Sequence, residues 1–298
     1  MRDPYAAFEA LVAPARPSAP LPRLIIGTVL TVVLFFSLIY CVSALLTVLS
    51  SAETLQRYDT ALATGNTPLG VLANLYVFAL VIIALAITLK QVHGRTLQSV
   101  IGDLNRARTQ FLRVIWFLVI LHLVLMVLLP GNPRAEPEPN MDLSRWLVFL
   151  PLALPAILIQ TSAEELAFRG YLQSQLAARF AHPVIWLTVP AILFGLLHYD
   201  TITQGDNAGV VLLWATAFGL ASADITARAG TLGPAIALHF MNNGAAILVA
   251  APTGNFDGLA LYTYPFSLDD AGSLWIWAPV DLMVLFISWL VTRLALRC

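Results

Sequence analysis

The sequence predicts an all-α polytopic membrane protein with about eight transmembrane helices, and three observations carry that prediction. The first is composition: 59% of the 298 residues are hydrophobic, only 11% are charged, and the mean hydropathy is +0.80. Soluble domains are about 45–50% apolar and about 25% charged, so this chain has too little polar surface to cover a water-facing globule. The second is a series of apolar segments near the roughly 20 residues that cross the hydrocarbon core as a helix. The third is the distribution of positive charge between them.

The apolar segments are separated by polar connections, and each is assigned to one helix. They are residues 24–49, 68–89, 114–130, 146–165, 183–198, 208–223, 231–251 and 273–292. We divide the chain accordingly. Residues 1–23 form a polar, proline-rich tail that we expect to be flexible and cytoplasmic. Residues 24–140 hold the first three helices, and residues 141–298 hold the last five.

The basic residues follow the positive-inside rule, by which cytoplasmic connections carry the excess of Lys and Arg. With the N-terminus inside, thirteen of the sixteen Lys and Arg residues fall in cytoplasmic segments. The outer loop at 252–272 has none, but it contains three aspartates. We therefore expect both termini in the cytoplasm, and a place in the plasma (inner) membrane if the protein is bacterial.

The longest inner connection, residues 90–113, leaves two interpretations open. Leu97, Val100, Ile101 and Leu104 recur at helical spacing beside several basic residues, which is typical of an amphipathic helix on the membrane surface. An ordinary solvated loop explains the segment equally well.

Charge and cysteine content suggest no partner other than lipid. The net charge is −1 and no basic stripe with interleaved aromatic residues is present, so no nucleic-acid partner is expected. Cys41 falls inside an apolar run and Cys298 is the last residue, a pattern that does not predict a disulfide framework. Nothing in the sequence predicts an oligomeric state.

The first concentration of ionisable residues is the segment SAEELAFRGYL, residues 162–172. Each ionisable group inside a bilayer costs roughly 2.5–3.5 kcal/mol on insertion scales, so each needs a reason. Glu165 and Arg169 have the i,i+4 spacing of an ion pair on one helix face. Glu164 then points about 100° away, without that partner, and is free for chemistry. The alternative is that both carboxylates simply mark the inner end of helix four.

Two further polar sets follow on later helices. In FGLLHY, Phe194 and His198 share one face of helix five, and in HFMNN, His239 and Asn243 share one face of helix seven. Considered alone, His198 is interpreted as a hydrogen-bonded residue at the membrane interface. His239 and Asn243, considered alone, are interpreted as polar contacts between helices. Together with Glu164 the sets are complementary, because hydrolysis needs a base, a group that orients water and donors for an oxyanion. We therefore expect an active site inside the helix bundle.

The order and spacing of these residues resemble the three motifs of the CAAX prenyl protease and bacteriocin-processing (CPBP, or Abi) family of intramembrane proteases. The motifs here are Glu164-Glu165-x-x-x-Arg169, Phe194-x-x-x-His198 and His239-x-x-x-Asn243. The resemblance covers about residues 145–250. It implies an endopeptidase that acts on a membrane-bound or lipidated peptide or protein, as eukaryotic members do when they trim prenylated CaaX proteins.

The resemblance also implies a role for each motif residue. Glu164 would be the general base, His198 would help hold the attacking water, and His239 with Asn243 would stabilise the oxyanion. Three residues would be structural: Glu165, Arg169 and Phe194. Glu164, His198 and His239 also make a two-histidine, one-carboxylate set that suits catalytic zinc. Since no HExxH is present, we favour a metal-free glutamate mechanism and keep zinc as the alternative.

The predicted helix boundaries conflict with a common site. They place Glu164 near the inner face, whereas His198 lies fifteen residues beyond Pro183, or roughly 22 Å toward the outer face at about 1.5 Å per residue. A shared site requires one correction: either Pro151 and Pro155 shift helix four, or residues 171–182 dip into the membrane.

Other polar residues in apolar segments have no motif to support a role. Asp281 has the strongest claim, since a lone intramembrane carboxylate is a functional candidate by default; His122 and Asn74 are weaker. Asp224 and Arg228 are expected to form a second i,i+4 ion pair, and two histidines are expected on the surface: His93 and His182. The competing functions are a transporter or channel lined by Glu, His and Asn, and a catalytically silent scaffold or immunity protein.

Overall fold

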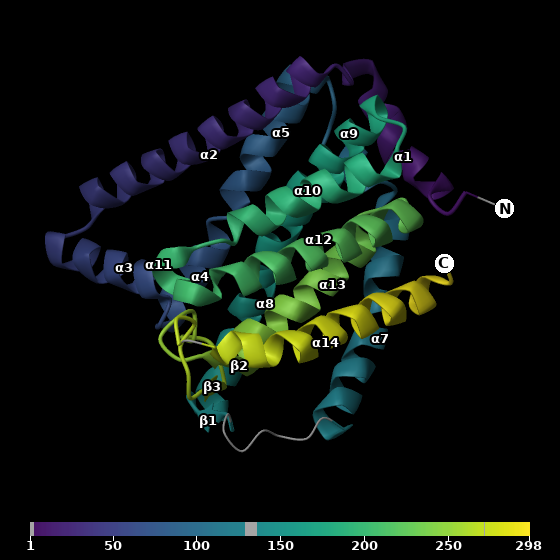
Figure 1. Cartoon of the computed structure of the whole chain (residues 1–298). Helices are drawn as coiled ribbons and strands as arrows, with labels where there is room; N and C mark the ends of the chain where they lie inside the picture. The colour runs from purple at the N-terminus through teal and green to yellow at the C-terminus, as the bar shows by residue number, and fades with distance from the viewer. Residues whose placement is uncertain (1–2, 129–135, 271) are drawn as a thin grey trace.

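The computed structural model describes residues 3–128, 136–270 and 272–298, and most of these residues are helical (Figure 1). The α-helices are α1 (Glu9–Val12), α2 (Leu21–Leu49), α3 (Ala52–Thr64), α4 (Pro68–Tyr76), α5 (Ala79–His93), α6 (Gln98–Ile101), α7 (Leu104–Leu128), α8 (Leu143–Glu165), α9 (Ser174–Arg179), α10 (Pro183–Leu197), α11 (Thr201–Gln204), α12 (Ala208–Ala229), α13 (Gly233–Gly244) and α14 (Ser273–Leu296). Two π-helical segments extend α8 and α13: Leu166–Gln173 and Ala245–Val249.

The all-α membrane fold is confirmed, but the predicted count of eight spanning helices is not. Six stretches among the described residues are long and apolar enough to cross a membrane: Leu21–Leu49, Pro68–His93, Leu104–Leu128, Leu143–Arg179, Thr201–Ala229 and Leu274–Leu296. The other two predicted spans are helical but shorter, because α10 has 15 residues and α13 has 12. The predicted end of helix three at residue 130 lies outside the described residues.

Helix four differs most from its predicted boundaries. It does not end at Glu165 but continues through the π-helical segment and α9 to Arg179, so that 37 residues form one stretch. The helix goes on because residues 166–179 contain no proline and pack into the bundle, where Leu166, Tyr171 and Leu176 are among the buried residues. The two glutamates therefore lie within the helix, and the interpretation that they mark its inner end is wrong.

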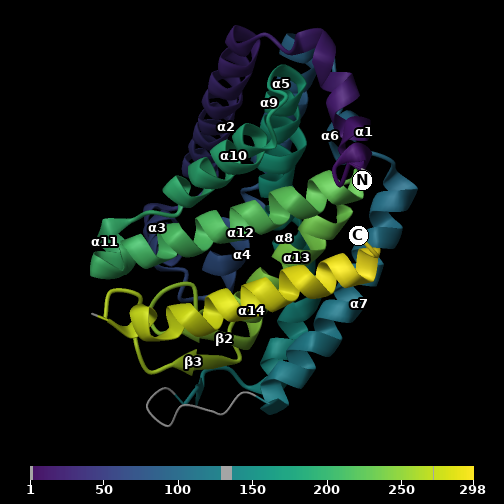
Figure 2. The same ribbon diagram turned by 45° about the vertical axis from the view of Figure 1, so that its right-hand side comes forward.

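The second half of the chain forms the bundle that positions the polar residues. Helices α12, α13 and α14 lie side by side, and α7 and α8 pack against α13 (Figures 1 and 2). Small residues allow close approach: a Cβ on Gly219 of α12 would lie 2.8 Å from the Ala191 Cα of α10. Such contacts are the usual way in which membrane helices pack without a hydrophobic driving force.

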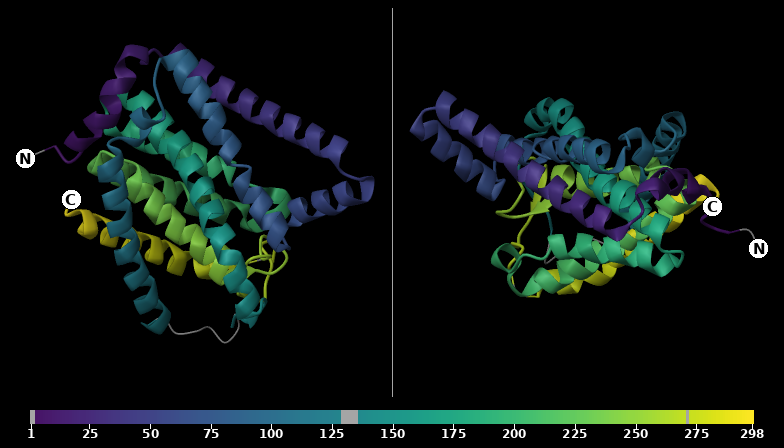
Figure 3. Two further views of the ribbon diagram at one scale, coloured as in Figure 1. Left: turned by 180° about the vertical axis from the view of Figure 1, so that it is seen from behind. Right: turned by 90° about the horizontal axis from the view of Figure 1, so that it is seen from above.

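Helix α2 stands largely apart from this bundle. Figure 3 shows α2 and α3 projecting beyond the other helices in both views. Within α2 only Leu24 and Gly27 are buried, and Gly27 sits where a Cβ would clash with the Tyr171 hydroxyl and His93. The remainder of α2 presents apolar side chains outward, as a lipid-facing helix does.

The N-terminal segment is not a flexible tail. Residues 6–18 form helical turns, and Phe8 and Leu11 are buried in the same core cluster as Trp186. The prediction missed this because the segment is proline-rich and its apolar residues are too few to stand out. His93 was likewise expected on the surface but is buried, with hydrogen bonds to Ser18 and Tyr171; His182 is exposed as predicted.

The connection at 90–113 contains neither a continuous amphipathic helix nor a simple solvated loop. Its first residues end α5, its last belong to α7, and only the short α6 lies between. Val100 is buried and Leu97 and Ile101 pack against the same core cluster as Phe8, so their helical spacing reflects burial against protein. Gly102 ends α6, and its φ of +89° is costly for other residues.

The two ends of the molecule are distinct. At one end the Arg228 guanidinium lies 5.1 Å from the Tyr5 ring, and both chain termini are found there (Figure 2); we call this the terminal end. At the opposite, loop end, a small sheet of order β1-β3-β2 is formed by Glu138–Pro139, Tyr262–Tyr264 and Ala250–Pro252. Strand β3 pairs antiparallel with β1 and parallel with β2. The two termini share one end, while their predicted cytoplasmic side stays a prediction.

Candidate active site

The predicted Glu165–Arg169 ion pair is present at the centre of the bundle. Arg169 Nη1 donates to Glu165 Oε1 at 3.1 Å, and neither side chain has any exposed surface. Three aromatic rings surround the guanidinium, with centroids 4.5–6.0 Å from its carbon: Phe168, Phe194 and Phe218. The Arg169 Nε and Nη2 atoms have no hydrogen-bond partner among the described residues. The cation–π contacts with the three rings compensate for these missing hydrogen bonds.

Glu164 lies on a different face and has one oxygen occupied and one available. Its Oε1 accepts a hydrogen bond of 2.7 Å from Gln160 Nε2, one turn earlier on α8. Its Oε2 is buried and has no hydrogen-bond donor among the described residues. The nearest polar atom recorded for Oε2 is Nε2 of His239, at 3.5 Å. A carboxylate oxygen held in place but unpaired is suited to accept a proton.

His239 bridges the two adjacent carboxylates from α13. Its Nδ1 is 2.8 Å from Glu165 Oε1, while its Nε2 faces Glu164 Oε2. Since a carboxylate can only accept, we assign the hydrogen to Nδ1. Nε2 then carries a hydrogen only in the imidazolium form. The imidazole edge facing Glu164 is therefore set by Glu165, the residue that the sequence identified as the structural member of the pair.

Asn243 reaches Glu164 through Gln160 rather than directly. Asn243 Nδ2 donates to Gln160 Oε1 at 2.8 Å, and Asn242 Nδ2 donates to Asn243 Oδ1 at 3.2 Å. The three amides and the carboxylate thus form one chain in which every N–H points toward Glu164. The chain fixes the amide orientations, because an ionised carboxylate at its end accepts only.

The longer fourth helix removes the conflict over the depth of His198. Fifteen residues separate Glu164 from the end of α9 at Arg179, and fifteen separate Pro183 from His198, so both lie about 22 Å from the turn. The rings of Phe168 and Phe194, one turn nearer to that turn, are in edge contact at 5.2 Å. The structure shows that residues 171–179 continue the helix that begins at Leu143; that residues 171–182 enter the membrane stays a prediction.

His198 ends α10 and packs beside the site without touching Glu164 in the contacts of the described residues. Its Nδ1 bonds to the Phe194 carbonyl oxygen at 2.8 Å, which leaves Nε2 free. The Phe194 ring lies 4.4 Å from the His198 ring and 6.0 Å from that of His239. Phe194 therefore contacts both imidazoles and also packs against the Arg169 guanidinium.

Two contributors were missed by the sequence analysis. Gln160 carries a signal that could have found it, since it is a polar residue in an apolar run and lies four residues before Glu164. Phe218 carries none. Its ring is 4.8 Å from that of His239 and 6.0 Å from the Arg169 guanidinium carbon. Nothing in the sequence distinguishes it from the other phenylalanines in apolar segments.

The residues suggested as zinc ligands are not arranged as a ligand set. Within the described parts of the chain, no group of three or more His, Cys, Asp or Glu side chains is placed to hold a metal ion. His239 Nδ1 is bonded to Glu165 and His198 Nδ1 to a carbonyl oxygen, contacts that leave Nε2 of each imidazole as the atom that could bind a metal. Among the described residues Glu164, His198 and His239 therefore do not form one ligand group, and the metal-free mechanism stays a prediction.

These features define a class: a polytopic helical membrane protein with a carboxylate–histidine–amide cluster buried in its bundle. Comparison with known families assigns the segment that carries it. Residues 145–245 match the family described as "Type II CAAX prenyl endopeptidase Rce1-like". The resemblance seen in the motifs is thereby confirmed over the part of the chain that contains Glu164, His198, His239 and Asn243.

The chain is also similar to one curated protein, whose name states no function. The "Uncharacterized protein YyaK" of Bacillus subtilis (strain 168) is 27% identical over 149 residues. The alignment covers 50% of this chain and 50% of that protein, so the chain spans half the length of the relative it matches. No solved structure matches the chain.

Proposed function

We propose that this protein is an intramembrane endopeptidase in which Glu164 is the general base. The observation that carries the proposal is the state of the Glu164 carboxylate: Oε1 is fixed by Gln160, and Oε2 is buried, unpaired and directed toward His239. The family match over residues 145–245 supports the reaction class. The expected substrate is a membrane-associated, CAAX-type lipidated peptide.

In the proposed first step, a water bound at Glu164 Oε2 attacks the scissile carbonyl carbon. Its proton passes to Oε2 as the carbon–oxygen bond forms. His198 Nε2 is not used by the chain itself and would hold the water in line. A positioned general base of this kind contributes roughly 10²–10⁴-fold to the rate.

The oxyanion that develops would be stabilised by His239 and Asn243. Asn243 Nδ2 has two hydrogens, of which Gln160 takes one, so the second is available. His239 is held by Glu165 at Nδ1, and its Nε2 edge would face the oxyanion. Glu164 then returns the proton to the leaving amine as the carbon–nitrogen bond breaks. Donors fixed in place before the reaction stabilise an oxyanion strongly in a site that excludes water.

The test is hydrolysis of a quenched, prenylated CaaX peptide by the purified full chain in detergent. Glu164→Gln keeps the size and the hydrogen bond to Gln160 but removes the base, and we expect kcat/KM to fall by roughly 10²–10⁴-fold. Glu53→Gln is the matched control, because Glu53 is an exposed carboxylate on α3, and it should leave the rate unchanged. A chelator is expected to leave the wild-type rate unchanged as well.

Three outcomes would contradict the proposal or part of it. Equal rates for wild type and Glu164→Gln would remove Glu164 as the base. Failure of the wild type to cleave any lipidated or membrane peptide, combined with uptake of an ion or solute into vesicles, would instead support the transporter alternative. Loss of activity with a chelator would restore the metal alternative despite the arrangement of the histidines.

A further inference from the structure

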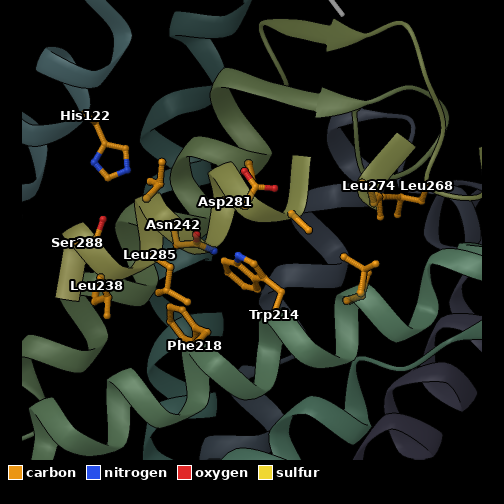
Figure 4. Close-up of a pocket in the computed structure, with 15 residues that line it drawn as sticks. His122, Trp214, Phe218, Leu238, Asn242, Leu268, Leu274, Asp281, Leu285 and Ser288 are labelled. Atoms are coloured by element: carbon orange, nitrogen blue, oxygen red, sulfur yellow. The ribbon is translucent and has the colours of Figure 1, made fainter. Parts of the chain in front are cut away.

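A second set of polar groups lies outside the candidate active site, in a cavity of about 410 Å³ bounded by α7, α12, α13 and α14. Most of its wall is apolar, formed by residues such as Val210, Trp214 and Leu285. Four polar side chains interrupt that wall: His122, Asn242, Asp281 and Ser288. In Figure 4, Asp281, Asn242 and Trp214 lie together at the centre of the cavity, and His122 lies to one side. The volume of the cavity is sufficient for a small ligand or for a side chain of a bound peptide.

Asp281 is the unusual member of this set. It lies about 12 Å along α14 from the loop end, within a stretch apolar enough to span the membrane. Its carboxylate has neither a hydrogen bond nor an ion pair in the part of the chain that the structure describes, and its side chain is exposed to the cavity. A carboxylate at this depth is costly without a partner, which indicates that the partner is a bound molecule.

The groups around Asp281 do not supply the missing positive charge. No Lys or Arg is found among the described residues that line the cavity. His122 Nδ1 bonds to the Leu118 carbonyl oxygen on its own helix. From strand β3, burial raises the pKa of the Tyr264 phenol and the nearby Asp281 charge raises it further, so Tyr264 stays neutral. The cavity is therefore apolar with one accessible negative charge.

The cavity adjoins the candidate active site through α13 and α12. Leu238 and Asn242 face the cavity, whereas their neighbours His239 and Asn243 face Glu165 and Gln160. Phe218 belongs to both, since it lines the cavity and its ring is 4.8 Å from that of His239. A peptide bound for cleavage would thus place a neighbouring side chain in the cavity.

We propose that this cavity is a side-chain subsite and that Asp281 makes it select lysine or arginine near the scissile bond of the substrate. A long alkyl stem matches the apolar wall, and the cation at its tip matches a carboxylate. Asp281 is therefore a specificity-determining residue. That the occupant is part of a cleaved substrate rests on the proposed function; that the cavity binds an alkyl cation does not.

The test is binding, measured so that cleavage cannot interfere. Fluorescein-labelled apolar decapeptides with one central Lys, norleucine or Glu are titrated into the full chain carrying Glu164→Gln in detergent, with empty micelles as blank. We expect the Lys peptide to bind at least about tenfold more tightly than the norleucine peptide, a difference of about 1.4 kcal/mol. Asp281→Asn should bring the ratio to about one, and Asp281→Lys should favour the Glu peptide.

The matched control is Asp206→Asn, which removes an exposed carboxylate at the same end of the molecule and should preserve the tenfold ratio. Asp281→Glu, which keeps the charge, should preserve the preference for Lys. Equal affinities for the Lys and norleucine peptides, no binding of either, or a preference that survives Asp281→Asn would each overturn the proposal. Cleavage by the chain with Glu164 intact is scored separately: Lys-selective binding without hydrolysis would sustain the subsite and reject the protease.

Discussion

Two regions of this molecule contain a glutamate and an arginine at the same i,i+4 spacing, in entirely different surroundings. Glu165 and Arg169 lie at the centre of the bundle with no exposed surface. Glu53 and Arg57 lie on α3, where their side chains are 75% and 79% exposed. The N–O distances are 3.1 Å and 2.6 Å, so the shorter contact belongs to the exposed pair.

Distance is therefore a poor guide to what each pair does. In water the attraction is largely offset by solvation and side-chain entropy, so exposed pairs contribute about 0–1 kcal/mol. In the bundle both charges have lost their water, so removing one partner leaves the other uncompensated. Glu165 also accepts from His239, and this third contact ties the buried pair to the candidate active site. The exposed pair has no such connection among its recorded contacts.

The largest expected effect on stability comes from breaking the buried pair. Glu165→Ala leaves the Arg169 guanidinium buried without a counter-charge, and we expect a loss of about 3–5 kcal/mol in the free energy of unfolding. Unfolding of the detergent-solubilised chain in increasing denaturant measures it. Activity should be lost too, because His239 loses the acceptor that orients it.

The double variant Glu165→Leu with Arg169→Leu separates stability from function. Replacing a buried ion pair by apolar residues of similar volume is often neutral or stabilising, so the double variant should recover most of the lost stability. It should stay inactive. A double variant as unstable as Glu165→Ala would show instead that the aromatic contacts of Arg169 hold the bundle together.

An intermediate effect is expected at the terminal end, where Asp224 and Arg228 form a largely buried pair of 2.9 Å. Asp224 also accepts hydrogen bonds from Tyr5 and Trp289, so it joins the N-terminal segment to α12 and α14. Hydrogen bonds to charged groups contribute about 1.5–3 kcal/mol, and we expect Asp224→Asn to cost about 2 kcal/mol. Limited proteolysis should also cut the N-terminal segment faster.

Tyr5→Phe isolates one of these contacts, because it removes only the phenolic hydroxyl. We expect it to cost about 1 kcal/mol and to accelerate proteolysis before residue 20 without changing cleavage of a membrane peptide. If Asp224→Asn and Tyr5→Phe both leave the proteolysis pattern unchanged, the N-terminal segment is held by its apolar contacts, chiefly those of Phe8 and Leu11 with the core.

The comparison also shows how far the sequence could predict this site. Spacing on a helix identified Glu165–Arg169 and Asp224–Arg228, since i,i+4 geometry depends only on local structure. It could not tell that the first pair is fully buried, because burial depends on which helices pack against α8. Hydropathy placed the helices, but it ended helix four at Glu165, where charge begins. The chain continues the helix there because no proline follows before Pro183 and Arg169 is paired with Glu165 inside the bundle.

The contacts made between distant segments were the least predictable. Gln160 has a local signal, its i,i+4 spacing to Glu164, but its bond to Asn243 on another helix has none. The contacts of Phe218 with Arg169 and His239 have no signal in one sequence either. The docking of residues 6–18 was hidden for the same reason, since Phe8 and Leu11 find their partners at Trp186, far along the chain. The sequence thus predicted the site residues that belong to motifs, and it missed those that reach the site only through the packing of helices.

The smallest effect is expected on α3, and it provides the strictest test of the comparison. Arg57→Ala removes the exposed pair with Glu53, and we expect the free energy of unfolding to change by no more than about 0.5 kcal/mol, less at high salt. Arg57→Lys is the matched control, since it keeps the charge and should be indistinguishable from wild type. A loss above about 1 kcal/mol in lipid vesicles but not in detergent would mean that the pair is desolvated at the membrane surface. The Glu53–Arg57 pair would then be exposed only outside a membrane, and the two ion pairs would differ in how far they are desolvated rather than in kind.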